Sequence, residues 1–251
     1  ENLLKTKSEI FQDSPQTAQL ICTHDQQDIL NNARNSGKKL RTFSAESQEA
    51  TVCCQNLTWP DSGGMSFELS YPENRSTLLE VKTDLAHEVY PLHCATVTAI
   101  TLSLELSTAA LKEIFNSYSG AKRRFEIHNI GSLCLVDDAY NANPESMLSG
   151  LKSFMHMSPE DKKWLILGDM KELGEASEAQ HYELGVIVGR LYNDALVNFV
   201  GEMSCHFMKG LKSSSPTNSS SRAYSCVQEL LKDQGHELQS FSGAIFLKAS
   251  N

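Results

Sequence analysis

Apolar and polar residues follow one another in blocks along this chain, and the spacing within each block predicts a helix or a strand. The first blocks predict a helix at 3–12, a strand at 18–22, a helix at 26–36 and a strand at 40–43. Residues 50–89 instead form short alternating runs broken by proline and glycine, which predicts an antiparallel meander. Two helices, at 93–106 and 108–118, are predicted to follow.

The second half alternates more regularly between apolar strands and amphipathic helices. Strands are predicted at 125–129, 132–137, 163–167, 196–200 and 244–248, and helices at 144–155, 178–192 and 222–233. The serine-rich run 212–221 predicts a surface loop. Small residues at 119–121 separate the halves, so we expect an α/β chain with domains at 1–120 and 121–251.

Two of the predicted strands end in acidic and amide residues just before a helix begins. The first loop covers 137–144 and reads Asp-Asp-Ala-Tyr-Asn-Ala-Asn-Pro, and the second covers 168–175 and reads Gly-Asp-Met-Lys-Glu-Leu-Gly-Glu. Ligands of open α/β sheets bind at the carboxyl ends of strands, beside the N-termini of helices. We therefore expect these two loops to face a common ligand.

Composition narrows the classes of function. The 251 residues carry a formal net charge of −9, which argues against a nucleic-acid-binding surface, and the densest basic cluster is Lys122-Arg123-Arg124. Seven cysteines without a C-x-x-C pair favour separate thiols in a reducing compartment. Neither a bilayer-spanning apolar run nor a signal peptide is recognisable, so no membrane partner is expected.

Several motifs of the second half resemble the C-terminal domain of the Mur ligases. The first is Arg124-Phe125-Glu126, and the second runs from Asp137 to Met147. The third begins at Gly168-Asp169-Met170 and continues through Glu172-Leu173-Gly174-Glu175 to Ser177, His181 and Gly185. Weaker similarity extends to both ends of the chain, including the strand at 243–250, which is similar to a late Lys-Gly-Ser strand of the family.

The resemblance implies both a fold and a reaction. It implies a truncated central ATPase domain at 1–120 and a Rossmann-like C-terminal domain at 121–251. The third motif is similar to that of the family member that joins D-alanyl-D-alanine to UDP-N-acetylmuramoyl-tripeptide in peptidoglycan precursor synthesis. In this chemistry ATP, with Mg²⁺, phosphorylates the substrate carboxylate, and an amine attacks the acyl phosphate. A monomer in the bacterial cytoplasm is expected, or in the plastid stroma if the source is a plant.

The resemblance also implies roles for individual residues. Arg124 is assigned as catalytic and nucleotide-binding, because a planar guanidinium suits a phosphate oxygen; a solvated arginine is the alternative. Asp138 is expected either to accept from the ribose or to orient its loop. Asn141 and Asn143 are expected at the nucleotide, although an asparagine before a helix also serves as a cap. His93 is either a nucleotide contact or a histidine at a helix start.

Four further residues have implied roles. Lys7 corresponds to a lysine that the family can carbamylate to help hold a magnesium ion, which requires a lowered lysine pKa; a solvated lysine is the alternative. Asp169 and Glu172 are expected to contact the ammonium group of the incoming dipeptide, or else to shape their turn. His181 is expected to have a structural role.

The chain also departs from the family pattern. It contains no G-x-x-x-x-G-K-[ST] phosphate loop, so we expect this chain alone to be inactive. Cys94 and Val97 replace asparagines of the adenine contact, and Ala249 replaces a glycine. Two explanations follow: the chain is part of a ligase, or it is a catalytically dead remnant that acts as a binding or scaffold protein.

Overall fold

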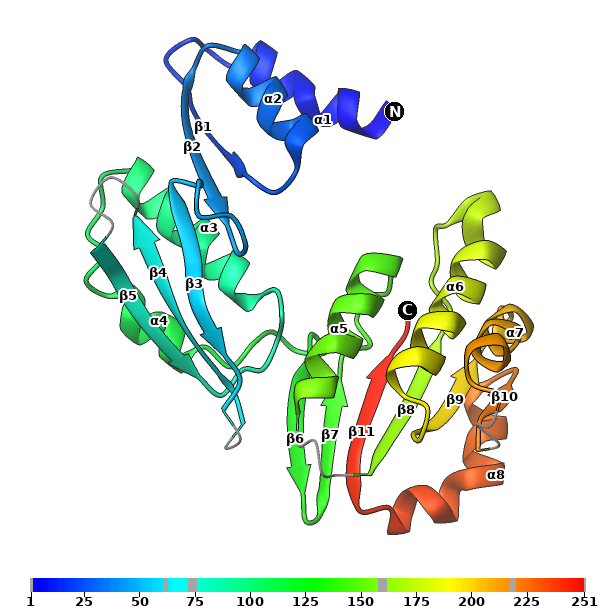
Figure 1. Cartoon of the computed structure of the whole chain (residues 1–251). Helices are drawn as coiled ribbons and strands as arrows, with labels where there is room; N and C mark the ends of the chain where they lie inside the picture. The colour runs from blue at the N-terminus through cyan, green and yellow to red at the C-terminus, as the bar shows by residue number, and fades with distance from the viewer. Residues whose placement is uncertain (1, 61–62, 72–75, 158–161, 217–219, 251) are drawn as a thin grey trace. The chain divides into compact units, whose positions relative to one another are not determined.

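The chain folds into two compact units, Glu1–Tyr118 and Ser119–Asn251 (Figure 1). The computed structural model describes residues 2–60, 63–71, 76–157, 162–216 and 220–250, and of residues 2–7 and 76–78 only the backbone. Each unit has its own β-sheet and its own buried core. The predicted α/β class is confirmed.

The first unit is organised around a sheet whose described strands follow the order β1-β2-β3-β4-β5. Strands β1 to β3 pair in parallel and β3 to β5 pair antiparallel, so a β-α-β segment leads into the expected meander. The elements are α1 (Asn2–Asp13), β1 (Gln19–Thr23), α2 (Gln27–Asn35), β2 (Lys39–Ser44), β3 (Val52–Thr58), β4 (Met65–Tyr71), β5 (Ser76–Thr83), α3 (Tyr90–Ser103) and α4 (Leu111–Ser117).

Helix α3 covers the core of this sheet, where Cys94, Ala95 and Ala99 are buried. The helix begins at Tyr90, three residues before the predicted start at His93. Pro91 suits a first helical turn, and the Tyr90 hydroxyl donates to the Phe115 carbonyl at 2.7 Å. His93 therefore lies within the first turn of α3 rather than at its opening.

The second unit has a sheet with the strand order β10-β9-β8-β11-β7-β6. All of these strands are parallel except β6, which pairs antiparallel with β7. The elements are β6 (Glu126–Ile130), β7 (Leu133–Asp137), α5 (Pro144–His156), β8 (Lys163–Gly168), a short 3₁₀ turn (Gly174–Ala176), α6 (Ser177–Leu191), β9 (Leu196–Val200), α7 (Ser204–Ser214), β10 (Arg222–Tyr224), α8 (Val227–Ser240) and β11 (Gly243–Lys248).

Side chains alternate across this sheet, as the strand period requires. Leu165, Phe199 and Phe246 belong to a buried cluster shared with α5, α6 and α7. Asn198, next to Phe199 in β9, instead meets Gln234 of α8. Helices therefore pack on both faces of the sheet, as parallel sheets require.

Two predictions about the end of the chain are wrong in part. The predicted helix 222–233 begins with a strand, because residues 222–224 pair with β9, and α8 starts only at Val227. The predicted loop 212–221 begins inside α7, a helix that the sequence did not reveal. Phe207 and Leu211 bury one face of α7, which stabilises the helix through its serine-rich end. Residues 217–219 lie outside the described part.

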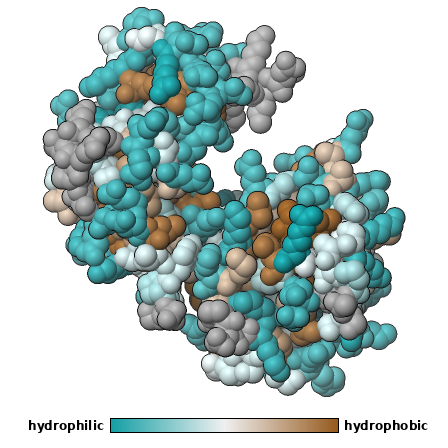
Figure 2. Space-filling view, viewed as in Figure 1, coloured by the Kyte–Doolittle hydropathy of each residue, from teal (hydrophilic) through white to brown (hydrophobic). Residues whose placement is uncertain are grey.

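The described residues also show the lengths of the helices, the state of the cysteines and the character of the surface. No helix among them is long and apolar enough to cross a membrane. None of the seven cysteines, all of which are described, is in a disulfide. Hydrophilic residues cover most of the visible face of each unit, with smaller hydrophobic patches among them (Figure 2), in keeping with the net charge of −9.

Candidate functional site

The two acidic loops follow β7 and β8 at the same edge of the sheet, since these strands are parallel to their common neighbour β11. We expected the loops to face a common ligand. The structure places β11 between their strands, so that residues at the end of β11 contact both loops. Lys248 reaches the first loop, and Ser250 reaches both.

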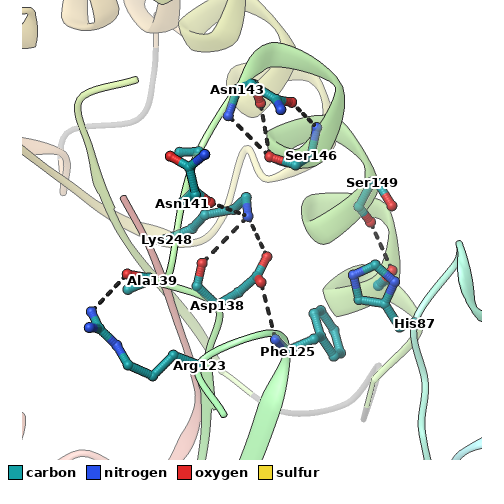
Figure 3. A network of polar contacts seen from close by, with 12 residues as sticks. His87, Arg123, Phe125, Asp138, Ala139, Asn141, Asn143, Ser146, Ser149 and Lys248 are labelled. Atoms are coloured by element: carbon teal, nitrogen blue, oxygen red, sulfur yellow. Dashed lines mark hydrogen bonds and ion pairs between the residues drawn. The ribbon is translucent and has the colours of Figure 1, made fainter. Parts of the chain in front are cut away.

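Lys248 forms a buried ion pair with Asp138 (Figure 3). The Lys248 Nζ lies 2.5 Å from Asp138 Oδ2 and also donates to the Asn141 carbonyl at 3.2 Å. The other carboxylate oxygen, Asp138 Oδ1, accepts from the Phe125 backbone N–H at 3.1 Å. Asp138 is only 7% exposed and Lys248 2%. Asp138 therefore orients its loop, one of the two roles expected for it.

Both side chains of this pair are almost completely buried. Burial raises the pKa of Asp138, and the adjacent Lys248 ammonium works against that rise. Gly150 of α5 leaves the space that the pair needs, because a methyl group there would lie 3.1 Å from Asp138 Oδ2 and 2.8 Å from the Phe246 ring. The pair is thus enclosed by a strand, a loop and a helix.

Asn143 caps helix α5 in this structure. Its side-chain oxygen accepts from the Ser146 N–H at 2.8 Å, and Ser146 Oγ accepts from the Asn143 N–H at 3.1 Å (Figure 3). This reciprocal capping box is one of the two roles left open for Asn143. Its nucleotide contact, like that of the exposed Asn141, stays a prediction.

The Ser250 hydroxyl connects the two loops. It accepts from the Ala142 N–H at 3.1 Å and from the Lys171 N–H at 3.3 Å, and it can donate to Asn141 Oδ1 at 3.0 Å. The Ser250 N–H donates to the Asp169 carbonyl at 3.0 Å. Ser250, two residues beyond the end of β11, therefore fixes the spacing between the loops that follow β7 and β8.

Arg124 lies on a tight loop before β6. Its neighbours Arg123 and Phe125 both have left-handed backbone conformations, with φ of 57° and 56°, which non-glycine residues seldom adopt. Phe125 turns inward and is completely buried, whereas Arg124 is exposed. The Arg124 guanidinium carbon lies 4.3 Å from the centre of the Tyr140 ring.

The loop after β8 is held by Asp169. Its two carboxylate oxygens accept from the backbone N–H groups of Glu202 and Met203, at 2.9 and 3.1 Å, just before α7 begins. Glu172 is exposed and has a φ of 64°. His181 is fully buried, and its Nε2 accepts from the Met170 N–H at 2.9 Å, which agrees with the structural role expected for it. The dipeptide contacts of Asp169 and Glu172 stay predictions.

Of the predicted site residues of the second unit, Asp138 and Asn141 are linked through Lys248, and Asn141 and Asp169 through Ser250. His93 and Lys7 belong to the first unit. His93 is exposed in the first turn of α3, and the side chain of Lys7 lies outside the described residues. Within the described ranges, no group of three or more His, Cys, Asp or Glu is arranged to hold a metal ion.

Sequence reasoning missed Lys248, Ser250 and Tyr140 as parts of the site. A signal for Lys248 was present, because a lysine that ends an apolar strand needs a buried partner. Tyr140 lies within the second motif and Ser250 within the strand that resembles the family's Lys-Gly-Ser strand. Their contacts could not be predicted, because they depend on which strands are neighbours in the sheet.

Comparison with known proteins agrees with this fold. Residues 123–218 match the family model described as Mur ligase, glutamate ligase domain. The part of the chain that matches this domain lies within the second unit.

Two curated relatives of the chain have the same name. The chain is 35% identical over 118 residues to the UDP-N-acetylmuramoyl-tripeptide--D-alanyl-D-alanine ligase of Mycobacterium tuberculosis, which covers 44% of this chain and 22% of the relative. It is 29% identical over 183 residues to the ligase of the same name from Escherichia coli, which covers 72% of this chain and 39% of the relative. The chain thus spans well under half of these relatives.

Solved structures show the same fold over nearly the whole chain. A crystal structure of MurF from Acinetobacter baumannii superposes with a TM-score of 0.82 at 21% identity, covering 99% of this chain and 52% of that one. The MurF ligase of Thermotoga maritima, solved in complex with ADP, superposes with a TM-score of 0.77 at 20% identity, covering 99% and 53%. Both units therefore have the fold of the matching half of these ligases.

Proposed function

We propose that this chain is part of an ATP-dependent amide-bond ligase of peptidoglycan precursor synthesis. The proposed reaction joins D-alanyl-D-alanine to UDP-N-acetylmuramoyl-tripeptide through an acyl phosphate. The observation that carries the proposal is the match of residues 123–218 to the Mur ligase domain, in a unit that exposes Arg124 beside an ordered strand-end loop. The names of the curated relatives support the choice of substrates.

Within this proposal the first unit is the latter part of the central ATPase domain, and the second is the complementary C-terminal domain. ATP, when bound, supplies the phosphoryl group. The Arg124 guanidinium would donate to phosphate oxygens, where negative charge develops and fixed donors are most effective. The buried Asp138–Lys248 pair would hold the β7–α5 loop rigid beneath it.

Asn141, Asn143 and His93 are proposed at the nucleotide, and Asp169 and Glu172 at the dipeptide. A carbamylated Lys7 is proposed to help hold Mg²⁺ in the whole enzyme. Of these residues, Asn141 and Glu172 have exposed side chains at the shared strand edge. Asp169 already accepts two backbone N–H groups, so a dipeptide ammonium would have to share its carboxylate.

A domain exchange tests the proposal directly. Residues 119–251 would replace the matching C-terminal domain of the E. coli ligase, and phosphate release would be measured with ATP and with one or both substrates. We expect turnover only when both substrates are present. Arg124→Ala should lower that turnover by about 10²-fold or more, because it removes a donor that acts on developing charge.

Lys122→Ala is the control for charge, since Lys122 is an exposed cation of the same basic cluster. A folded exchange protein that binds ATP but shows no turnover with both substrates would contradict the ligase proposal. That result would favour the alternative, a binding or scaffold protein that keeps the ligase fold.

A further inference from the structure

Arg124 is fixed in the chain by both of its neighbours. The Arg123 side chain donates to the Ala139 carbonyl at 2.7 Å, and its own carbonyl accepts from the Tyr140 N–H at 3.1 Å. On the other side, the Phe125 N–H donates to Asp138 and the Phe125 ring packs against Phe246. The loop of Arg124 is thereby attached at three points to the loop that carries Tyr140.

The contacts of the two arginines differ completely. Arg123 is engaged with carbonyl and carboxylate oxygens of its surroundings. The Arg124 guanidinium lies over the Tyr140 ring, and no hydrogen bond or ion pair joins it to another residue of the described chain. Stacking uses the flat face of a guanidinium and leaves the N–H groups at its edge available to donate to phosphate oxygens.

We propose that Tyr140 is the positioning residue that holds the Arg124 guanidinium ready for a phosphoryl oxyanion. This proposal rests on the function proposed above. Tyr140 is half exposed, so its ring offers a platform at the surface rather than a place in the core. A long arginine side chain loses much rotamer freedom when it binds. Stacking on the ring restricts that freedom before the anion binds. The hydrogen bonds between the two loops hold the Arg124 backbone at a fixed position relative to Tyr140.

The proposal predicts how variants of Tyr140 behave. Tyr140→Phe keeps the ring, so it should keep the phosphate affinity of the native chain. Tyr140→Leu removes the ring and should raise the dissociation constant for a polyphosphate about two- to five-fold, the range of an exposed cation–π contact. Tyr182→Leu is the matched control, since Tyr182 is an exposed tyrosine of α6 in the same unit.

The experiment uses the 251-residue chain, isotopically labelled, with inorganic tripolyphosphate as the probe. The side-chain N–H and CδH₂ signals of Arg124 are assigned by comparison with Arg124→Lys. In the native chain and in Tyr140→Phe they should be shifted upfield by the ring and should move when tripolyphosphate is added. In Tyr140→Leu the upfield shift should disappear and the titration should weaken.

Unchanged Arg124 signals and affinity in Tyr140→Leu would overturn the proposal, as would an Arg124 that does not respond to tripolyphosphate in the native chain. The ligase proposal is tested separately by the domain exchange. A ring-dependent response of Arg124 without any turnover in the exchange protein would uphold Tyr140 as a positioning residue for an anion and reject the ligase reaction.

Discussion

Asp138 and Lys248 show how much depends on one contact between two buried side chains. Each would be costly to bury alone, and together they hold the β7–α5 loop against β11. Removing one partner leaves the other charged and without its counterion inside the unit. The stability of the site should therefore be more sensitive to Lys248 than to any exposed lysine.

Lys248→Met is expected to lower the free energy of unfolding by about 3–5 kcal/mol at pH 7. Burial already raises the pKa of Asp138, and loss of the ammonium group raises it further. The folded variant then binds a proton more tightly than the unfolded chain, so its stability falls as pH rises through the interval between the two pKa values. The difference in free energy of unfolding between the native chain and the variant should be largest at neutral pH and smaller near pH 4.

Urea unfolding of the variant and the native chain at both pH values measures this effect. Lys152→Met on α5 serves as the control. If the variant is destabilised equally at pH 4 and pH 7, the loss of stability cannot come from an unpaired Asp138 carboxylate.

At the scale of elements, helices α6 and α7 pack with almost no space between their backbones. A methyl group at Gly185 would lie 2.1 Å from the Phe207 carbonyl oxygen, and one at Gly210 would lie 1.9 Å from the Tyr182 carbonyl oxygen. Phe199 stacks on Phe207 beneath them, with ring centres 4.5 Å apart. Glycine is thus required on both helices for this close approach.

Gly185→Ala should destabilise the chain by about 1–3 kcal/mol or more, because its methyl group would collide with backbone that cannot move aside cheaply. Gly235→Ala on α8 is the matched control, since nothing lies within 4 Å of a methyl group there. That substitution should be neutral or stabilising by up to about 1 kcal/mol. Chemical denaturation measures both, and equal effects of the two substitutions would contradict the packing argument.

Helices and strands with a strong apolar pattern were predictable from the sequence. Elements that form only because they pair with a neighbouring strand were not. Strand β8 contains the continuous apolar run 164–167, strand β9 is apolar apart from Asn198, and α5 begins with a cap and a proline. Strand β10 is three residues long and exists because it pairs with β9. Likewise Arg124 and Asp138 could be selected from motifs, whereas the Asp138–Lys248 pair required knowing that β11 lies beside β7.

At the scale of the whole molecule, the chain consists of two units that each contain a core. The second unit buries a large cluster that includes Phe154, Leu165, Phe199 and Phe246. The first has a separate cluster beneath α3. Two independent cores allow each unit to fold without the other.

Residues 119–251, expressed alone, should therefore fold and unfold in a single cooperative transition. Circular dichroism and urea titration would be compared with those of the full chain, which should show the same transition together with one from the first unit. Phe246→Asp in the isolated unit is the control, because it places a charge in the core. A fragment without a cooperative transition would show that its core depends on the first unit.

The position of β11 has a consequence for how the second unit is made. This strand comes later in the sequence than the other strands of its sheet, yet it lies between β8 and β7. During synthesis β7 and β8 leave the ribosome before β11, the strand that pairs with both. Their edges toward β11 therefore stay unpaired until β11 has been made. The sheet can close only after residues 243–248 have emerged. A premature stop codon a few residues upstream would thus remove the centre of the unit rather than its margin.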